Sequence, residues 1–180
     1  MKDLALEKLK YPIGEFKCPD VITEEQIKIW IAALEMLPQS VFETIGTLSA
    51  KQLETPYRPG GWTIRQLVHH FADSHHHCYT RFKWALTEDG PIIKAYEEKD
   101  WSELFDAKTA PIQLSLDYLK ALHAKLVYLL KGLSKTDLKK YYIHPESNEK
   151  VTVAENIGRY AWHSNHHVAH LKGIVARNNW

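Results

Sequence analysis

The chain has 180 residues, of which 44% are hydrophobic and 25% charged, and its formal net charge is +1. These values are typical of a single soluble domain, and without a basic block they exclude a nucleic-acid or anionic-membrane surface. No apolar run approaches the roughly 20 residues that span a bilayer. We therefore expect one cytoplasmic domain over residues 1–180. Residues 1–20 form an N-terminal extension that lacks the apolar segment of a signal peptide.

The first long helix is predicted to begin at Thr23, because Thr23 and Gln26 have the spacing of a capping box. Apolar residues then recur at helical spacing as far as Ile45. Pro38 is expected to kink or break this helix, because proline lacks the backbone N–H that a helix interior needs.

A second helix is predicted from Thr63 to about Leu86, again opened by a threonine and by a glutamine three residues later. Residues 87–110 are rich in aromatic side chains and are predicted to form a long crossover. A third, leucine-rich helix begins near Pro111, since proline suits the first turn of a helix.

The fourth helix is predicted to run from Thr152, paired with Glu155, to about Ala176. Residues 141–151 can form a small hairpin before it. The whole pattern is all-α and predicts a four-helix bundle with one long crossover connection.

A faint internal repeat relates the second and fourth helices. "LSAKQL" at 48–53 precedes one, and "LSKTDL" at 133–138 precedes the other. The repeat suggests that the two helices occupy equivalent places in a pseudo-symmetric bundle.

Four of the 11 histidines lie within "WHSNHHVAH" on the fourth helix. Each residue advances a helix by about 100°, which places His163 and His167 at one edge of the apolar stripe. Their spacing of four puts both rings on one face, as in the HExxH metal sites. His166 and His170 share this spacing but are predicted to point towards water.

The second helix carries five histidines in "VHHFADSHHH". By the same phase, His70 lies at the stripe edge that corresponds to His163, and His69 points to solvent. His75 falls within the stripe as a core histidine, whereas His76 and His77 point away from it.

His70, His163 and His167 are therefore predicted to converge on one divalent metal ion. Three histidines without an obvious fourth protein ligand are typical of catalytic sites, which keep one position open. Imidazole suits zinc, nickel, copper or iron, so the ligand type does not name the metal. The alternative is that some of these rings are surface or core histidines.

Several other side chains are weaker candidates. Asp73 can orient a ligand ring or act as a base, or it is a solvated carboxylate. Arg65 can bind an anionic group, or it lies on a solvated face. Cys18 and Cys78 are too far apart in sequence to suggest a disulfide framework and are not expected to supply a reactive thiol. A group of aromatic residues can line a pocket or belong to the core: Trp62, Tyr79, Trp84, Trp101 and Trp162.

The segments "GGWTIRQLVHHFADS" and "WHSNHHVAHLKGI" resemble the DinB-like superfamily, in particular its YfiT-type metal-dependent hydrolases, which are related to the bacillithiol S-transferases. The resemblance covers nearly the whole chain and includes "YPIGEF", "TPYRPGGWT", the "RF" at 81 and the "HP" at 144. It implies that His70, His163 and His167 are the metal ligands. It also implies a homodimer and a zinc- or nickel-type ion. His170 stands where the family usually has glutamine, and Ala169 stands where the family usually has glycine.

Three functions follow as expectations. A three-histidine centre can lower the pKa of a bound water and polarise a substrate oxygen, which supports hydrolysis of a small molecule. The same open position can bind a low-molecular-weight thiol as thiolate for S-transfer to an electrophile. The third possibility is a non-catalytic domain whose metal is structural.

Overall fold

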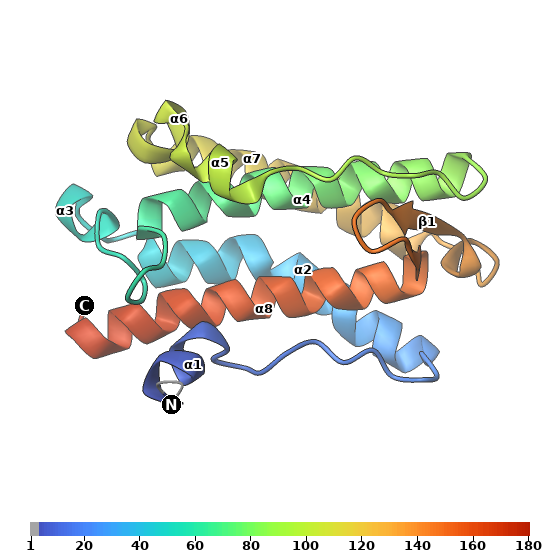
Figure 1. Ribbon diagram of the computed structural model, residues 1–180, viewed down its shortest axis with the longest axis horizontal. Coiled ribbons are helices and arrows are strands. Elements are labelled where there is room, and N and C mark those ends of the chain that lie inside the picture. The colour runs from blue at the N-terminus through green and yellow to red at the C-terminus, as the bar shows by residue number, and fades with distance from the viewer. Residues whose placement is uncertain (1–3) are drawn as a thin grey trace.

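The computed structural model describes residues 4–180 and shows the expected four-helix bundle (Figure 1). Its long helices are α2 (Glu24–Ile45), α4 (Ile64–Thr87), α7 (Ile112–Lys131) and α8 (Val153–Asn178). In the bundle, α8 contacts α2 and α4, and α7 contacts the same two helices. The all-α prediction is confirmed.

The long crossover runs back along α4 before α7 begins, so that α4 and α7 point the same way (Figure 1). It contains two short helices, α5 (Glu98–Glu103) and α6 (Phe105–Thr109). Gln66 Nε2 donates to the carbonyl of Ser102 at 2.8 Å, and an Arg65 guanidinium nitrogen donates to the carbonyl of Ala110 at 2.8 Å. These bonds hold the crossover over the first turns of α4.

Side-chain caps fix where the helices begin. The Thr63 hydroxyl accepts from the Gln66 N–H, and the Gln66 side chain accepts in return from the Thr63 N–H at 2.9 Å. Thr23 and Thr152 cap α2 and α8, each accepting an N–H three residues later, but of the three predicted capping boxes the one at Thr63 is the complete one. Each cap satisfies a backbone donor that the helix itself leaves unpaired.

Pro38 lies inside α2 without breaking it, so of the two effects expected of this proline, a kink or a break, the break does not occur. A proline removes the hydrogen bond to the carbonyl four residues earlier, here that of Leu34. His123 on α7 supplies the missing donor, because its Nδ1 lies 2.6 Å from the Leu34 carbonyl oxygen. A side chain from another helix thus replaces the lost bond.

The hydrophobic core consists of two clusters, one towards each end of the bundle. On α4 the division falls between Phe71 and Cys78, and on α8 it falls between Ala161 and Val168. Buried histidines occupy both intervals. The bundle therefore contains a polar layer between two apolar halves.

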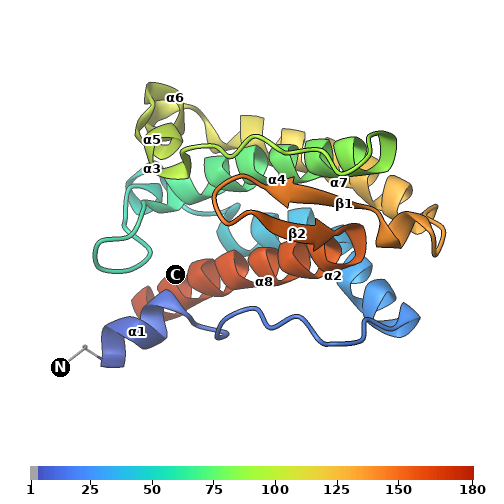
Figure 2. The same ribbon diagram turned by 45° about the vertical axis from the view of Figure 1, so that its right-hand side comes forward.

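A small hairpin precedes α8, as the sequence suggested. β1 (Tyr141–His144) pairs antiparallel with β2 (Glu149–Thr152), as Figure 2 shows. The two repeated hexapeptides end in short helices, α3 (Ala50–Leu53) and η1 (Asp137–Lys139). Each short helix is followed by antiparallel pairing that leads into a capped long helix. Pro56 bridges to Thr63 before α4, and β1 pairs with β2 before α8.

The N-terminal segment follows the outer side of α8 (Figures 1 and 2). α1 (Leu4–Lys10) is followed by an irregular stretch, and the Trp162 indole N–H donates to the carbonyl of Gly14 at 3.2 Å. Residues 1–3 of the expected extension lie outside the described residues. Within residues 4–180, no helix has both the length and the apolar character needed to cross a bilayer.

Candidate metal centre

Three imidazoles from α4 and α8 meet in the histidine layer. Nε2 of His163 lies 3.3 Å from Nε2 of His70 and 3.1 Å from Nε2 of His167. One nitrogen of each ring lies within 4.8 Å of those of the other two. The structure thus brings together the three histidines that helical phase selected.

Burial keeps these rings neutral at physiological pH. Desolvation lowers the pKa of His70 from 6.5 to about 4. It also lowers the pKa of His163 and of His167 well below the usual value, and the neighbouring rings lower both further. Since metals bind neutral imidazole, the electrostatics of the cluster suit a ligand set.

The donor atoms of these rings also fit a metal ion. A neutral imidazole carries only one N–H. Nδ1 of His163 and Nδ1 of His167 are buried without a hydrogen-bond partner in residues 4–180. If their protons are on Nδ1, the Nε2 lone pairs face one another, and a cation relieves that repulsion. Three nitrogen ligands with an open side match a catalytic centre.

A cavity of about 790 Å³ adjoins the cluster on one side, and His163 forms part of its wall. His163 is half-buried, whereas His70 and His167 are buried. The rest of the wall comes from α8, α4, the crossover, the hairpin and the N-terminal segment, including Phe16, Arg81, Tyr96, His144, Tyr160 and Trp162. The histidine cluster is therefore enclosed on the side of the core, and His163 gives access to it from this cavity.

The sequence profile of the DinB superfamily matches residues 33–171. The chain belongs to this superfamily. A protein of Oceanobacillus iheyensis is 47% identical over 171 residues, which cover 95% of this chain and 98% of that protein. A protein of Bacillus cereus (strain ATCC 10987) is 50% identical over 176 residues, with coverages of 97% and 100%. Both carry the name "Putative metal-dependent hydrolase".

A solved structure supports the same relationship. YfiT from Bacillus subtilis superposes with a TM-score of 0.94 and 45% identity, over 96% of this chain and 99% of that one. It is described as "a probable metal-dependent hydrolase with an unusual four-helix bundle topology". The resemblance to DinB-like proteins is confirmed, and so is the bundle fold.

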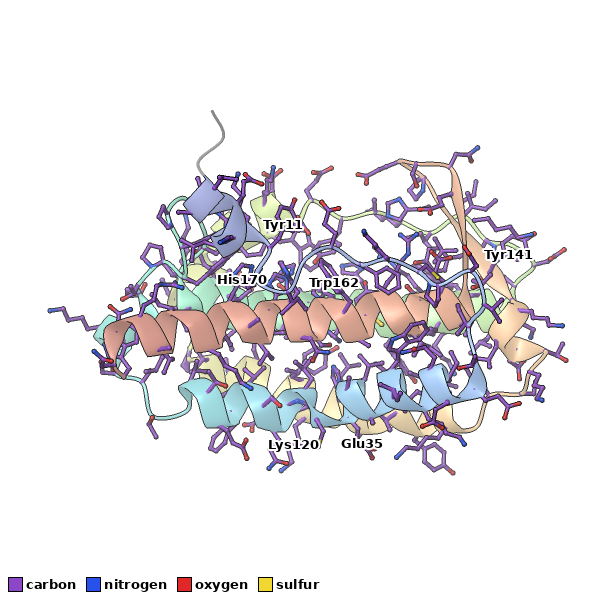
Figure 3. All side chains as sticks on the ribbon, turned by 90° about the horizontal axis from the view of Figure 1, so that it is seen from below. Tyr11, Glu35, Lys120, Tyr141, Trp162 and His170 are labelled. Carbon is purple, nitrogen blue, oxygen red and sulfur yellow. The ribbon has the colours of Figure 1, made fainter. Side chains whose placement is uncertain are left out.

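A second group of histidines lies beside the first on this DinB-superfamily chain. Nε2 of His166 and Nε2 of His170 are 3.1 Å apart, and only 9% and 5% of these residues are exposed. The prediction that both point to water was wrong. The Tyr57 ring lies 4.4 Å from that of His170, and Trp162 stacks on His166 at 4.7 Å. Figure 3 shows Tyr11, Trp162 and His170 on the same side of α8.

Two other histidines of α4 are also covered by distant parts of the chain. His69, expected in solvent, is buried, and its ring nitrogens lie 2.7 Å from the Ser115 hydroxyl and 3.2 Å from the Ala110 carbonyl. His77 is half-buried and stacks on Tyr96 at 4.2 Å, whereas His76 is exposed as predicted. The crossover and α7 cover the face that helical phase assigned to water.

His75 is fully buried, as the stripe predicted, and it belongs to a hydrogen-bonded chain that the sequence did not indicate. His123 Nδ1 donates to the Leu34 carbonyl, so its Nε2 must accept. His75 Nδ1, 3.0 Å away, therefore carries the proton. The sequence signal for this arrangement is the proline at 38, which frees the Leu34 carbonyl.

Asp73 makes no hydrogen bond to the three clustered rings within residues 4–180, although it lines a narrow space beside His70. Burial, and next the charge of Asp106, raise its pKa from 3.8 to about 6. The geometry gives no contact through which it would orient a ligand. Arg65 pairs with Glu54 at 2.7 Å as well as with the crossover, so it is not a free anion site.

The remaining candidates divide between the cavity and the core. Cys18, expected to play no part, is exposed on the cavity wall, and its pKa is raised mainly by burial, so the thiol stays protonated. Trp162 lines the cavity too, whereas Trp62 packs on the His70 ring at 4.7 Å. Trp84 and Tyr79 pack against the core cluster.

Proposed function

We propose that this chain is a metal-dependent hydrolase of small molecules, with zinc or nickel held by His70, His163 and His167. The observation that carries the proposal is the double position of His163. Its Nε2 belongs to the cluster, and its side chain also lines the cavity of about 790 Å³. A ligand ring that faces a cavity of this size leaves room for a substrate beside the centre.

When bound by three imidazoles, a divalent ion supplies Lewis acidity to a substrate oxygen and makes water more acidic. The chain's own residues position the reaction. His70 and His167 close the centre towards the core, because both are buried between α4 and α8. Tyr160 lies on the cavity wall one turn before His163, and burial raises the pKa of its hydroxyl, so that this hydroxyl stays protonated and can donate to a substrate.

The relatives support this proposal at the level of their names, which describe metal-dependent hydrolases. An open cavity favours an enzyme over a purely structural centre, since structural sites enclose the metal with four protein ligands. The experiment compares protein that is stripped of metal with zinc-loaded and nickel-loaded protein on a panel of esters and amides. Metal-dependent turnover that is lost in His163→Gln supports the proposal, and turnover equal in all samples contradicts it.

The size of the cavity also favours a second candidate, metal-dependent S-transfer from a small thiol to an electrophile. Burial raises the pKa of the Cys18 thiol, which disfavours the reactive thiolate form. A low-molecular-weight thiol such as bacillithiol would therefore enter from solution. Mass spectrometry of the product separates the two candidates, because hydrolysis adds oxygen and transfer adds the sulfur of the thiol.

A further inference from the structure

Arg81, on the last third of α4, lines the cavity and forms no ion pair among residues 4–180. One of its terminal nitrogens donates to the Tyr160 hydroxyl at 3.2 Å. Its Nε is buried and has no hydrogen-bond partner in residues 4–180. None of the ion pairs between the described residues includes Arg81. A guanidinium has five N–H donors, and leaving a buried donor unpaired is unfavourable.

The other arginine of the cavity is neutralised. Arg159 contacts Glu149 and Glu155, with nitrogen–oxygen distances of 2.7 Å to each carboxylate. Among the described residues, the hydrogen-bond partner of Arg81 is a phenolic oxygen. Of the two guanidinium groups in this wall, Arg81 is therefore the one able to accept an anion from solution.

The position of Arg81 relates it to the histidine cluster. Arg81 and His163 line the same cavity. Tyr160, which holds the guanidinium, has its ring centroid 5.7 Å from that of His163. An anionic group bound by Arg81 would therefore place the rest of a small ligand beside the cluster.

From this arrangement we propose that Arg81 forms an anion subsite that binds the carboxylate of the substrate. The planar guanidinium can form two parallel hydrogen bonds to a carboxylate, one of them from Nε. Exposed carboxylates at the rim, from Glu97, Glu98 and Glu146, repel ligands of higher negative charge. Phe16 and Trp162 offer aromatic surface to the body of the ligand.

The proposal rests on the proposed function only in calling the ligand a substrate, so its test uses binding to metal-free protein and no turnover. The probes are benzoate, its neutral analogue benzamide, and phenyl phosphate. Affinities are measured by titration of protein NMR resonances, including the Nε–H of Arg81. The wild type should bind benzoate about 10- to 100-fold more tightly than benzamide, as expected for a charge-assisted pair.

The variants separate a binding role from a structural one. Arg81→Gln should lose the preference for benzoate but bind benzamide as before, whereas a loss of fold would weaken both. Lys99→Gln removes the same charge from the exposed rim of the cavity and should keep the preference. Arg81→Lys retains the charge but not the planar pair of N–H donors, so it should reduce the preference for benzoate without abolishing it. This variant also tests the subsite if the glutamine variant does not fold.

Three outcomes would overturn the proposal. The first is that the wild type binds benzoate no better than benzamide, which includes no binding of either. The second is that Arg81→Gln keeps the full preference for benzoate. The third is that phenyl phosphate binds more tightly than benzoate, which would assign the subsite to phosphate esters. Repeating the titrations with zinc-loaded protein then shows whether bound carboxylate and metal are compatible.

Discussion

Two histidine pairs on α8 have the same spacing and nearly the same geometry, yet their surroundings differ. His163 with His167, and His166 with His170, each bring two Nε2 atoms to 3.1 Å. The first pair receives a third ring from α4, that of His70, and faces a cavity. The second pair lies under aromatic rings. Helical spacing alone therefore does not decide which of the two pairs would bind a metal.

The second pair is covered by aromatic rings and is joined by a hydrogen bond of its own. Tyr57 and Trp162 pack on His170 and His166, and a hydrogen bond between the two Nε2 atoms satisfies one donor in a buried place. A nitrogen of His167 nevertheless lies within 4.8 Å of this pair, so metal content must distinguish the two groups.

The largest expected effect is on metal binding. His163→Ala removes a ligand from the centre of the cluster, and its metal affinity should fall by more than the roughly 10- to 100-fold that loss of an outer partner costs. His166→Ala is the matched control and should keep wild-type metal content. Elemental analysis of both variants, purified without chelator, makes the measurement. If only His166→Ala loses metal, the second pair binds the metal and the first pair does not.

Acidification should destabilise the metal-free protein through both groups. Burial lowers the pKa of His70 to about 4, and burial together with the charge of His166 lowers that of His170 to about 3. Between each of these folded-state pKa values and the ordinary value of 6.5, the unfolded chain binds more protons than the folded one. The free energy of unfolding is therefore at its full value above pH 6.5 and declines below it. The cost is about 2 kcal/mol at pH 5 for a histidine such as His70.

Zinc should stabilise the protein through the first group at neutral pH. A metal that binds the folded state stabilises it and competes with protons for the neutral imidazoles. Urea denaturation should therefore give a higher free energy of unfolding with zinc at pH 7, and this gain should shrink as the pH approaches the pKa of about 4 of His70. No gain at pH 7 would mean that zinc does not bind the folded protein.

A smaller effect is expected when the second pair is disrupted. His170→Ala removes the partner of His166 and part of the packing against Tyr57, so the free energy of unfolding should fall by about 1–3 kcal/mol. Metal content should stay unchanged. His76→Ala, at an exposed histidine of α4, is the control and should change stability by about 0.5 kcal/mol or less. Chemical denaturation followed by circular dichroism measures both.

The smallest effect is expected at Asp73, which makes no hydrogen bond to the clustered rings. Asp73→Asn should change metal affinity by less than the roughly 10-fold that marks an orienting partner. Competition with a colorimetric zinc chelator is sensitive enough to measure this. A larger loss would show that the carboxylate reaches a ligand ring once metal is bound.

The helices and the angular positions of the clustered rings were readable from the sequence, because both depend on neighbouring residues. Threonine caps act over three residues, and helical phase acts over seven or eight. These rules located the starts of α2, α4 and α8 and selected His70, His163 and His167. Whether these rings bind a metal remains a prediction.

The tertiary structure alone decided what covers each face. Phase gives the direction of a side chain, but it cannot tell whether a crossover, an N-terminal segment or water lies there. For this reason His69, His166 and His170 are buried although their direction predicted solvent. The unbroken α2 also depends on His123, which lies 85 positions after Pro38 (123 minus 38). The cavity and the unpaired guanidinium of Arg81 arise in the same way, because they require segments from five parts of the chain to meet.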